Sequence, residues 1–187
     1  MLAQPIETER FLIRPLIAED ATGIFELDSN PKVHTYLGND PIKTLAEAEK
    51  VIKLIQKQYK DLGIGRWAII EKSTGNFVGW TGFKYIVEPT NGKVNYYDLG
   101  YRLIEIYWGK GIATETAKAC LKYAFEVLKL EEVYGICDVE NAGSKNVLQK
   151  CGFELKETFI YDGTPHYWFE IKRDYTSAKS INLPFNN

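Results

Sequence analysis

A segment in the middle of the chain passes from a predicted strand through a glycine-bearing turn directly into a long predicted helix. The strand covers residues 95–103, the turn carries Gly109 and Gly111, and apolar residues recur at helical spacing over 111–129. Such a unit must bury the apolar stripe of its helix against an apolar sheet face. The order of these elements therefore constrains the chain to a sheet that is covered by helices.

The rest of the chain supplies further strands and helices. Helical periodicity predicts a short helix after residues 18–20, an amphipathic helix over 45–62 and a short helix over 143–151. Alternation and turn residues predict further strands over 8–16, 67–71, 76–87, 132–139, 155–161 and 167–172. Strands dominate the first half and strand–helix units the second, which predicts a mixed α/β sheet with helices on both faces.

The size and composition of the chain indicate one folded domain. The 187 residues have a mass of 21.4 kDa, and we expect a single domain over 1–173 with a polar C-terminal tail over 174–187. Hydrophobic residues make up 45% of the chain, which excludes an intrinsically disordered protein. The 23 basic and 25 acidic residues nearly cancel, so nucleic acid is not expected as a partner.

Membrane and metal binding are not expected either. No apolar run approaches the ~18 residues of a membrane span, and the N-terminus shows no secretory signal. Cys120, Cys137 and Cys151 are odd in number and far apart, which favours reduced thiols in a cytoplasmic protein. With two histidines in the chain, a structural zinc site is not expected.

The glycine-bearing turn has the properties of an anion site. Gly109 and Gly111 have no side chain, so a ligand can approach the backbone closely. No Ser, Thr, Asp or Asn directly precedes the helix to cap its first N–H groups, and a pyrophosphate would satisfy them. Lys110 adds a positive charge. The spacing of a Walker loop is absent, Thr114 stands where a dinucleotide fingerprint needs glycine, and an ordinary turn is an equally good interpretation.

A second segment of the same kind follows at 138–153, where Asn141 and Ser144 stand between a predicted strand and a predicted helix. Together the two segments resemble the GNAT N-acetyltransferases, whose acetyl-CoA loop has the form Gln/Arg-x-x-Gly-x-Gly/Ala. The matching residues are Trp108-Gly-Lys-Gly111-Ile-Ala113, with tryptophan in place of Gln or Arg.

Three features are similar to one branch of that family, the ribosomal-protein alanine and serine N-acetyltransferases. They are Trp108, the opening Glu7-Thr-Glu-Arg10-Phe-Leu-Ile-Arg14, and Leu99-Gly100-Tyr101. The resemblance runs from about residue 6 to about residue 173. It implies the GNAT fold, an α/β architecture with a central mixed, mostly antiparallel, twisted sheet of about seven strands and helices on both faces.

The resemblance also implies acetyl-CoA as co-substrate, without a metal. Backbone groups near Leu103 and the side chain of Asn141 would meet the pantetheine arm, and the amides of 109–114 the pyrophosphate. Asn141 as a simple helix cap and Trp108 as a packing residue are the alternatives. The implied cofactor-binding residues are Leu103, Trp108, Gly109, Lys110, Gly111, Ile112, Ala113, Thr114, Asn141, Ser144, Asn146 and Lys150.

Acetyl transfer needs a base for the amine and a proton donor for the leaving thiolate. Ser144 is the expected donor; many relatives use a tyrosine, and the helix after Ser144 contains none. Asp98 is the expected base because it lies on the strand that leads to Gly100, with Asp162 and Glu105 as alternatives. An exposed strand residue is an equally good interpretation of Asp98.

The implied function is transfer of an acetyl group from acetyl-CoA to a primary amine by direct attack in a ternary complex. The acceptor would be a protein N-terminal α-amine or a small-molecule amine. Because an α-amine has a pKa of about 7.7–8.0 against about 10.4 for lysine, a site without a strong base favours an α-amine. A non-catalytic acyl-CoA-binding module is the alternative, and we expect a monomer or homodimer.

Overall fold

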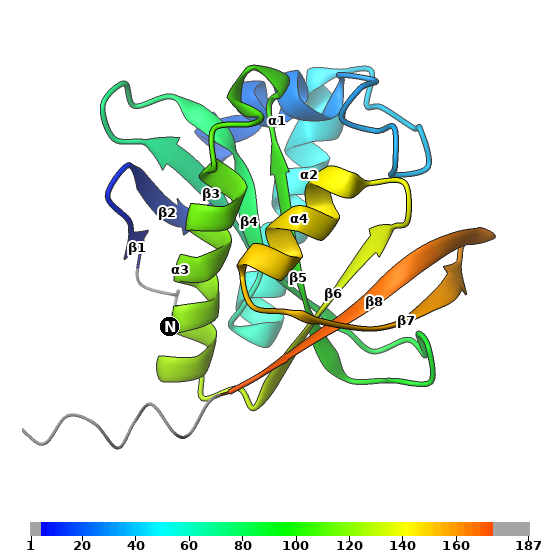
Figure 1. The fold of residues 1–187 in the computed structure, drawn as a ribbon. Helices are drawn as coiled ribbons and strands as arrows, with labels where there is room; N and C mark the ends of the chain where they lie inside the picture. The colour runs from blue at the N-terminus through cyan, green and yellow to red at the C-terminus, as the bar shows by residue number, and fades with distance from the viewer. Residues whose placement is uncertain (1–4, 174–187) are drawn as a thin grey trace, which may run out of the picture.

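The computed structural model describes residues 5–173, and the predicted polar tail over 174–187 lies outside the described residues. Its strands form one sheet in the order β1-β2-β3-β4-β5-β6-β8-β7 (Figure 1). The strands are β1 (Ile6–Glu7), β2 (Phe11–Pro15), β3 (Arg66–Glu71), β4 (Phe77–Ile86), β5 (Tyr96–Leu103), β6 (Glu132–Asp138), β7 (Glu154–Tyr161) and β8 (Thr164–Lys172). The helices are α1 (Ala21–Asp28), α2 (Leu45–Leu62), α3 (Ile112–Glu126) and α4 (Ala142–Lys150), with short 3-10 turns η1 (Ala18–Asp20) and η2 (Glu105–Tyr107).

The mixed, mostly antiparallel sheet is confirmed, since β5 and β6 are the one parallel pair among the described strands. The structure has eight strands where about seven were predicted. The additional strand, β1, is two residues long, too short to show an alternating pattern. The strand predicted from residue 8 begins at Phe11 instead, because Thr8 and Phe11 form a hydrogen-bonded turn between β1 and β2.

Helices cover both faces of the sheet, as predicted. Figure 1 shows α3 and α4 across the front of the sheet and α1 and α2 behind it. Trp67 of β3 meets Tyr123 of α3 edge-on at 5.5 Å between ring centroids, and Leu148 of α4 packs over Gly135 of β6. On the other face, Arg102 of β5 forms an ion pair with Asp28 of α1.

The two parallel strands separate soon after they meet. β5 and β6 pair at Asp98 and Tyr134, and no further residue of β5 pairs with β6 in the described sheet. Both strands continue toward their C-terminal ends and diverge there, with α4 in front of the gap (Figure 1). The inner edges of β5 and β6 therefore keep backbone groups without ladder partners, which is where an extended ligand could pair with them.

The buried cysteine thiols are unreactive at neutral pH. The three cysteines are unpaired and buried, and burial raises the pKa of Cys120 to about 12 and the pKa of Cys137 and of Cys151 to about 11. These thiols therefore stay protonated at neutral pH. Within residues 5–173, no helix is long and apolar enough to cross a membrane, and no group of three metal-ligating side chains is assembled.

We expect Gly135→Ala to destabilise the fold by loosening α4 from the sheet. A Cβ at this position would lie 2.7 Å from Cδ2 of Leu148, so the helix must shift or the leucine must change rotamer. Such overpacking costs about 1–3 kcal/mol, and each kcal/mol lowers Tm by roughly 2–4 °C in a chain of this size. Thermal unfolding followed by circular dichroism measures the change.

Gly143→Ala is the matched control for this substitution. It lies within α4, and its added Cβ would have only an ordinary contact, 3.5 Å from Oδ1 of Asn141. Alanine is preferred over glycine in a helix by roughly 0.5–1 kcal/mol, so Tm should rise slightly. A Tm for Gly135→Ala equal to that of the wild type would show that the α4 contact is not tightly packed.

Candidate active site

The turn before α3 presents backbone donors to open space. Gly109 and Gly111 have φ values of +72° and +75°, and Gly111 begins the helix without any side-chain cap. Among the described residues, no hydrogen-bond acceptor faces the N–H groups of 109–114. A Cβ added at Gly109 would meet nothing within 4 Å. The absence of a side-chain cap is confirmed, and the turn can take an anion at the positive end of the helix dipole.

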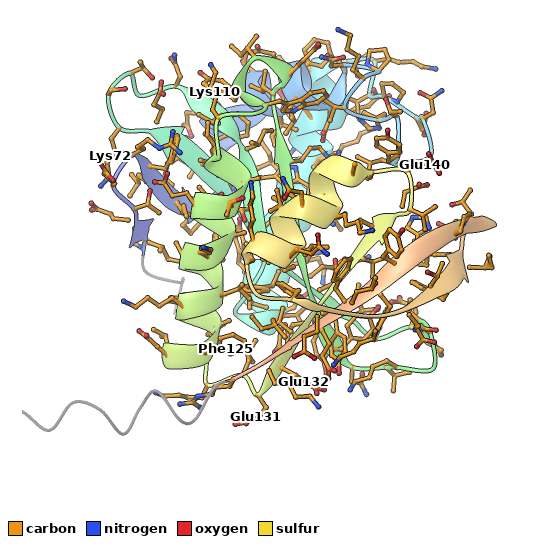
Figure 2. The ribbon with its side chains drawn as sticks, in the orientation of Figure 1. Lys72, Lys110, Phe125, Glu131, Glu132 and Glu140 are labelled. Atoms are coloured by element: carbon orange, nitrogen blue, oxygen red, sulfur yellow. The ribbon has the colours of Figure 1, made fainter. Side chains whose placement is uncertain are left out.

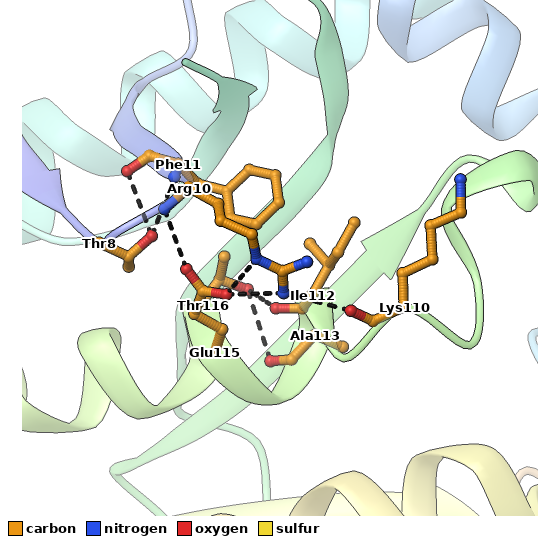
Figure 3. A network of polar contacts seen from close by, with 8 residues as sticks. All are labelled: Thr8, Arg10, Phe11, Lys110, Ile112, Ala113, Glu115 and Thr116. Carbon is orange, nitrogen blue, oxygen red and sulfur yellow. Dashed lines mark hydrogen bonds and ion pairs between the residues drawn. The ribbon is translucent and has the colours of Figure 1, made fainter. Parts of the chain in front are cut away.

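Arg10 holds this turn in place from the other end of the chain (Figure 3). Its Nε donates to the carboxylate of Glu115 at 2.7 Å, and its Nη2 donates to the carbonyl of Lys110 at 3.2 Å. Partial burial raises the pKa of Glu115, but hydrogen bonds from Thr8 and Arg10 outweigh it, so the net pKa lies below the ordinary value. The guanidinium thus offsets an acidic charge in the first helical turn. Sequence reasoning placed Arg10 in a motif but missed this bracing role.

Hydrogen bonds also connect the C-terminal end of β5 to this turn and to β4. The indole N–H of Trp108 donates to the carbonyl of Leu103 at 2.8 Å, while the ring stays 44% exposed. Ile104 donates its N–H to Val78. Among the backbone groups around Leu103 that were expected to meet a ligand, the carbonyl of Leu103 is therefore already engaged. Lys110 is exposed beside this turn (Figure 2). Its ammonium nitrogen lies 5.4 Å from the centre of the Tyr107 ring.

The second predicted segment begins α4. Asn141 caps this helix, since its Oδ1 accepts from the N–H of Ser144 at 2.9 Å. The capping bond is therefore present, and a contact of Asn141 with the cofactor stays a prediction. Asn146 and Lys150 lie further along α4 and are exposed. The hydroxyl of Ser144 lies 3.0 Å from that of Tyr101, which also donates to the carbonyl of Ser144. Burial raises the pKa of Tyr101, so this phenol stays protonated.

Tyr101 is, with Tyr107 and Tyr161, one of the tyrosines that the sequence offers as proton donor if Ser144 does not act. The helix after Ser144 contains no tyrosine, but β5 supplies Tyr101 from more than 40 residues earlier in the chain. Tyr101 was also part of the Leu99-Gly100-Tyr101 motif that the sequence analysis identified. Only the packing of α4 against the sheet brings the two hydroxyls together.

Asp98 lies on the opposite face of β5. Its Oδ1 is buried and has no hydrogen-bond partner among the described residues, so the interpretation as an exposed strand residue is wrong. Burial raises the pKa of Asp98 to about 7, against the lowering influence of Arg66, Lys84 and the backbone of Ile136. A carboxyl with this pKa exchanges protons near neutral pH, as a general base must.

The alternative bases are less suited. Glu105 accepts from Asn30 at 2.9 Å and forms an ion pair with Lys32 at 2.5 Å, and these hydrogen bonds hold its pKa below the ordinary value. Asp162 lies in the exposed turn between β7 and β8 with φ of +47°. His166 lies near the same turn and packs against the ring of Tyr161 at 5.4 Å.

Alternation along β5 divides the candidate residues between the two faces of the sheet. Tyr101 points toward α4, where it meets Ser144, and Arg102 points toward α1, where it meets Asp28. Asp98 and Gly100 share the face of Arg102, since the pairing of β4 with β5 is regular over this stretch. The two hydroxyls and the carboxyl therefore flank the gap between β5 and β6 from opposite sides.

Comparison with known proteins identifies the family. The family described as "Acetyltransferase (GNAT) domain" matches residues 10–154. The chain is 27% identical to the N-acetyltransferase YoaA of Bacillus subtilis over 165 residues, which cover 86% of this chain and 91% of YoaA. It is 32% identical to the FsC-acetyl coenzyme A-N(2)-transacetylase of Aspergillus fumigatus over 170 residues, which cover 87% and 72% of the two chains. The chain therefore belongs to the GNAT family and is an acetyl-CoA-dependent N-acetyltransferase.

Other relatives act on different acceptors. The spermidine N(1)-acetyltransferase of Escherichia coli is 28% identical over 176 residues, which cover 89% of this chain and 81% of that enzyme. A GNAT acetyltransferase structure from Bacillus anthracis superimposes with a TM-score of 0.75 at 25% identity, covering 90% and 98% of the chains. A ribosomal-protein alanine acetyltransferase from Vibrio fischeri shares the fold, with a TM-score of 0.74 at 16% identity and coverage of 92% and 98%.

We expect Asp98→Asn to stabilise the folded protein above neutral pH. The pKa of Asp98 rises from 3.8 to about 7 in the folded state, so ionisation penalises the folded state and its stability falls as the pH rises between those values. The amide does not ionise. A difference of about three pKa units corresponds to about 4 kcal/mol, so the variant should gain roughly that much over the wild type between pH 4 and pH 7, and the gain should level off above. Urea unfolding at several pH values measures it.

Asp162→Asn, in the exposed turn, is the control for that experiment. It removes a carboxyl without relieving a buried charge, so its stability difference from the wild type should not follow the same pH course. A difference for Asp98→Asn that stays constant from pH 4 to pH 8 would contradict the raised pKa.

Proposed function

We propose that the protein transfers the acetyl group of acetyl-CoA directly to a primary amine in a ternary complex. The observation that carries this proposal is the gap between β5 and β6, with unpaired backbone donors at one end and titratable groups on both sides. The acceptor is a small-molecule amine or a protein N-terminal α-amine. Relatives named for spermidine and for ribosomal-protein alanine support these two classes.

The binding roles follow from the geometry of the two helix starts. The N–H groups of 109–114 would hold the pyrophosphate, because they lack acceptors and no Cβ blocks Gly109. Lys110 would add positive charge, and Asn146 and Lys150 would reach the outer part of the cofactor. The pantetheine arm would run past Leu103, Trp108 and Asn141. Because Oδ1 of Asn141 already caps α4, its amide nitrogen is the group left for the ligand.

Asp98 would act as the base. Its ionised form accepts a proton from the amine, directly or through a water, and the neutral amine then forms the new C–N bond at the thioester carbon. A backbone N–H on the inner edge of β5 would stabilise the oxyanion. As the C–S bond breaks, the thiolate needs a proton, and the hydroxyl of Ser144 is the proposed donor. Tyr101, at 3.0 Å, would replace that proton or supply it itself.

The cytoplasm is the proposed setting, supported by three thiols that remain unpaired. The proposed oligomeric state is a monomer or homodimer. Sedimentation analysis of the full chain tests this state.

We expect Gly109→Ala to weaken acetyl-CoA binding by at least about tenfold. The added methyl group would project into open space from the turn that carries the unpaired amides, and the φ of +72° adds backbone strain of about 1–2 kcal/mol. Gly75→Ala is a closely matched control, since Gly75 has φ of +74° and equally open surroundings in the β3–β4 turn. Calorimetric titration should show the affinity loss for Gly109→Ala alone, with similar loss of stability in both variants.

If Gly109→Ala binds acetyl-CoA as tightly as the wild type, the pyrophosphate is held elsewhere. If the wild type binds acetyl-CoA but acetylates no amine in a broad panel, the protein has kept the fold as a binding module.

We expect Ser144→Ala to lower kcat while the KM for acetyl-CoA stays nearly constant, because a proton donor acts in the transition state. The reduction should be about 10- to 100-fold, below the full range for acid catalysis, since Tyr101 lies near enough to substitute in part. Ser144→Ala combined with Tyr101→Phe should then lose more than either alone. Steady-state kinetics measures all three variants.

Gln149→Ala, an exposed position on the same helix, is the control and should leave both constants unchanged. Full turnover in the double variant would place the proton donor elsewhere.

A further inference from the structure

On the sheet face beneath α1, two arginine side chains contact the ring of one tryptophan. The indole of Trp80 lies over Gly100 of β5, where an added Cβ would be 3.1 Å from the ring. The guanidinium carbons of Arg66 and Arg102 lie 4.7 Å and 5.3 Å from the centre of this ring. The buried ring of Trp80 therefore has two cationic groups within cation–π distance, on the sheet face that also carries Asp98.

The two arginines differ in their partners. Arg102 donates to Oδ1 of the buried Asp28 at 2.6 Å. The guanidinium of Arg66 has no hydrogen bond and no ion pair with any residue in 5–173, although a guanidinium has five N–H donors. Burial and repulsion from Arg102 both lower the pKa of Arg66. The guanidinium is half-buried on the Trp80 ring, and within residues 5–173 its N–H donors have no anionic partner, so they remain for an anion of a ligand.

The charges around Arg66 favour the binding of one anion. Asp28 is satisfied by Arg102, and Asp98 lies on the same face of β5, one alternation from Gly100. Lys84, opposite Asp98 on β4, adds another positive charge. The two arginines and the lysine outweigh Asp28 and a partly protonated Asp98. A ligand that places a second ammonium here would be repelled, whereas a carboxylate would be attracted.

We propose that Arg66, together with Arg102, binds a carboxylate of the acceptor, so that the preferred acceptors are small amines that carry a carboxylate near the amino group. This inference rests on the proposed function. The planar Arg66 fork can pair both carboxylate oxygens. The amino group of the same molecule would then be directed toward Asp98. An amino acid has this arrangement of groups, while a polyamine and a peptide N-terminus lack the adjacent carboxylate.

The kinetic test compares acceptors that differ only in the carboxylate. Each of a panel of amino acids is paired with its own amide, and kcat/KM is measured for wild type, Arg66→Met and Arg66→Lys. Arg66→Met should lower kcat/KM for the acids by about 10- to 100-fold more than it lowers kcat/KM for the matching amides. Arg66→Lys should recover part of the loss, since it keeps the charge but not the fork.

For each acceptor, kcat/KM of the variant is divided by kcat/KM of the wild type. This ratio cancels the difference in basicity between an amino acid and its amide. It also removes any effect of Arg66 on the pKa of Asp98, which would change both acceptors equally. Equal losses for acids and amides would overturn the proposal. So would a higher kcat/KM for spermidine than for every carboxylate-bearing amine in the panel.

Lys84→Met is the matched control for loss of a positive charge. Lys84 also faces Asp98 but is exposed and has no contact with the Trp80 ring. Its removal should change acids and amides alike. If Lys84→Met alters the preference for acids as strongly as Arg66→Met does, the preference comes from the overall positive potential of this face and not from a carboxylate site.

A binding measurement separates this inference from the proposed function. In the presence of CoA, N-acetylglycine and its amide are titrated calorimetrically into the wild type and Arg66→Met, with thermal melts to verify that the variant folds. Tighter binding of the acid to the wild type, reduced about 10-fold or more in Arg66→Met, supports the carboxylate site even if no amine is acetylated. Equal binding of acid and amide to the wild type overturns it, whatever the transferase activity.

Discussion

The interaction on which the site depends is the short parallel pairing of β5 with β6. One residue pair, Asp98 with Tyr134, joins the two halves of the sheet before the strands diverge. A continuous ladder would leave no unpaired backbone at the centre of the protein and would separate the two faces completely. Where the ladder ends, Ser144 and Tyr101 on one face and Asp98 on the other flank the same unpaired backbone. Helices α3 and α4 cover the first face, and α1 and α2 cover the second.

Charge is arranged differently at the two ends of this gap. Near α3, exposed backbone donors and Lys110 supply positive potential, and Arg10 offsets the acidic Glu115 that would weaken it. On the α1 face, Asp98 and Arg66 are groups whose ionised forms are disfavoured by burial. Both disfavoured groups cost folding stability, which is characteristic of residues retained for binding or catalysis. The first end suits a polyanionic cofactor and the second a small acceptor.

Much of the fold followed from local pattern. The helix over 45–62 was predicted with its observed bounds because its apolar stripe is a local feature. The anion site at the glycine turn stays a prediction, and it rests on a missing cap and two positions without side chains, both of which can be identified in the sequence. The two-residue β1 was missed, since pairing so short depends on its neighbour rather than on its own residues.

The sequence by itself determined the family, the order of elements and the backbone donors before α3, because these depend on residues close together in the chain. Only the tertiary structure decided the rest. Tyr101 meets Ser144, and Arg66 shares the ring of Trp80 with Arg102, across separations of tens of residues. Burial of Asp98, which raises its pKa to about 7, likewise requires the assembled sheet. Desolvation and long-range contact are properties of packing, and no local pattern of residues specifies them.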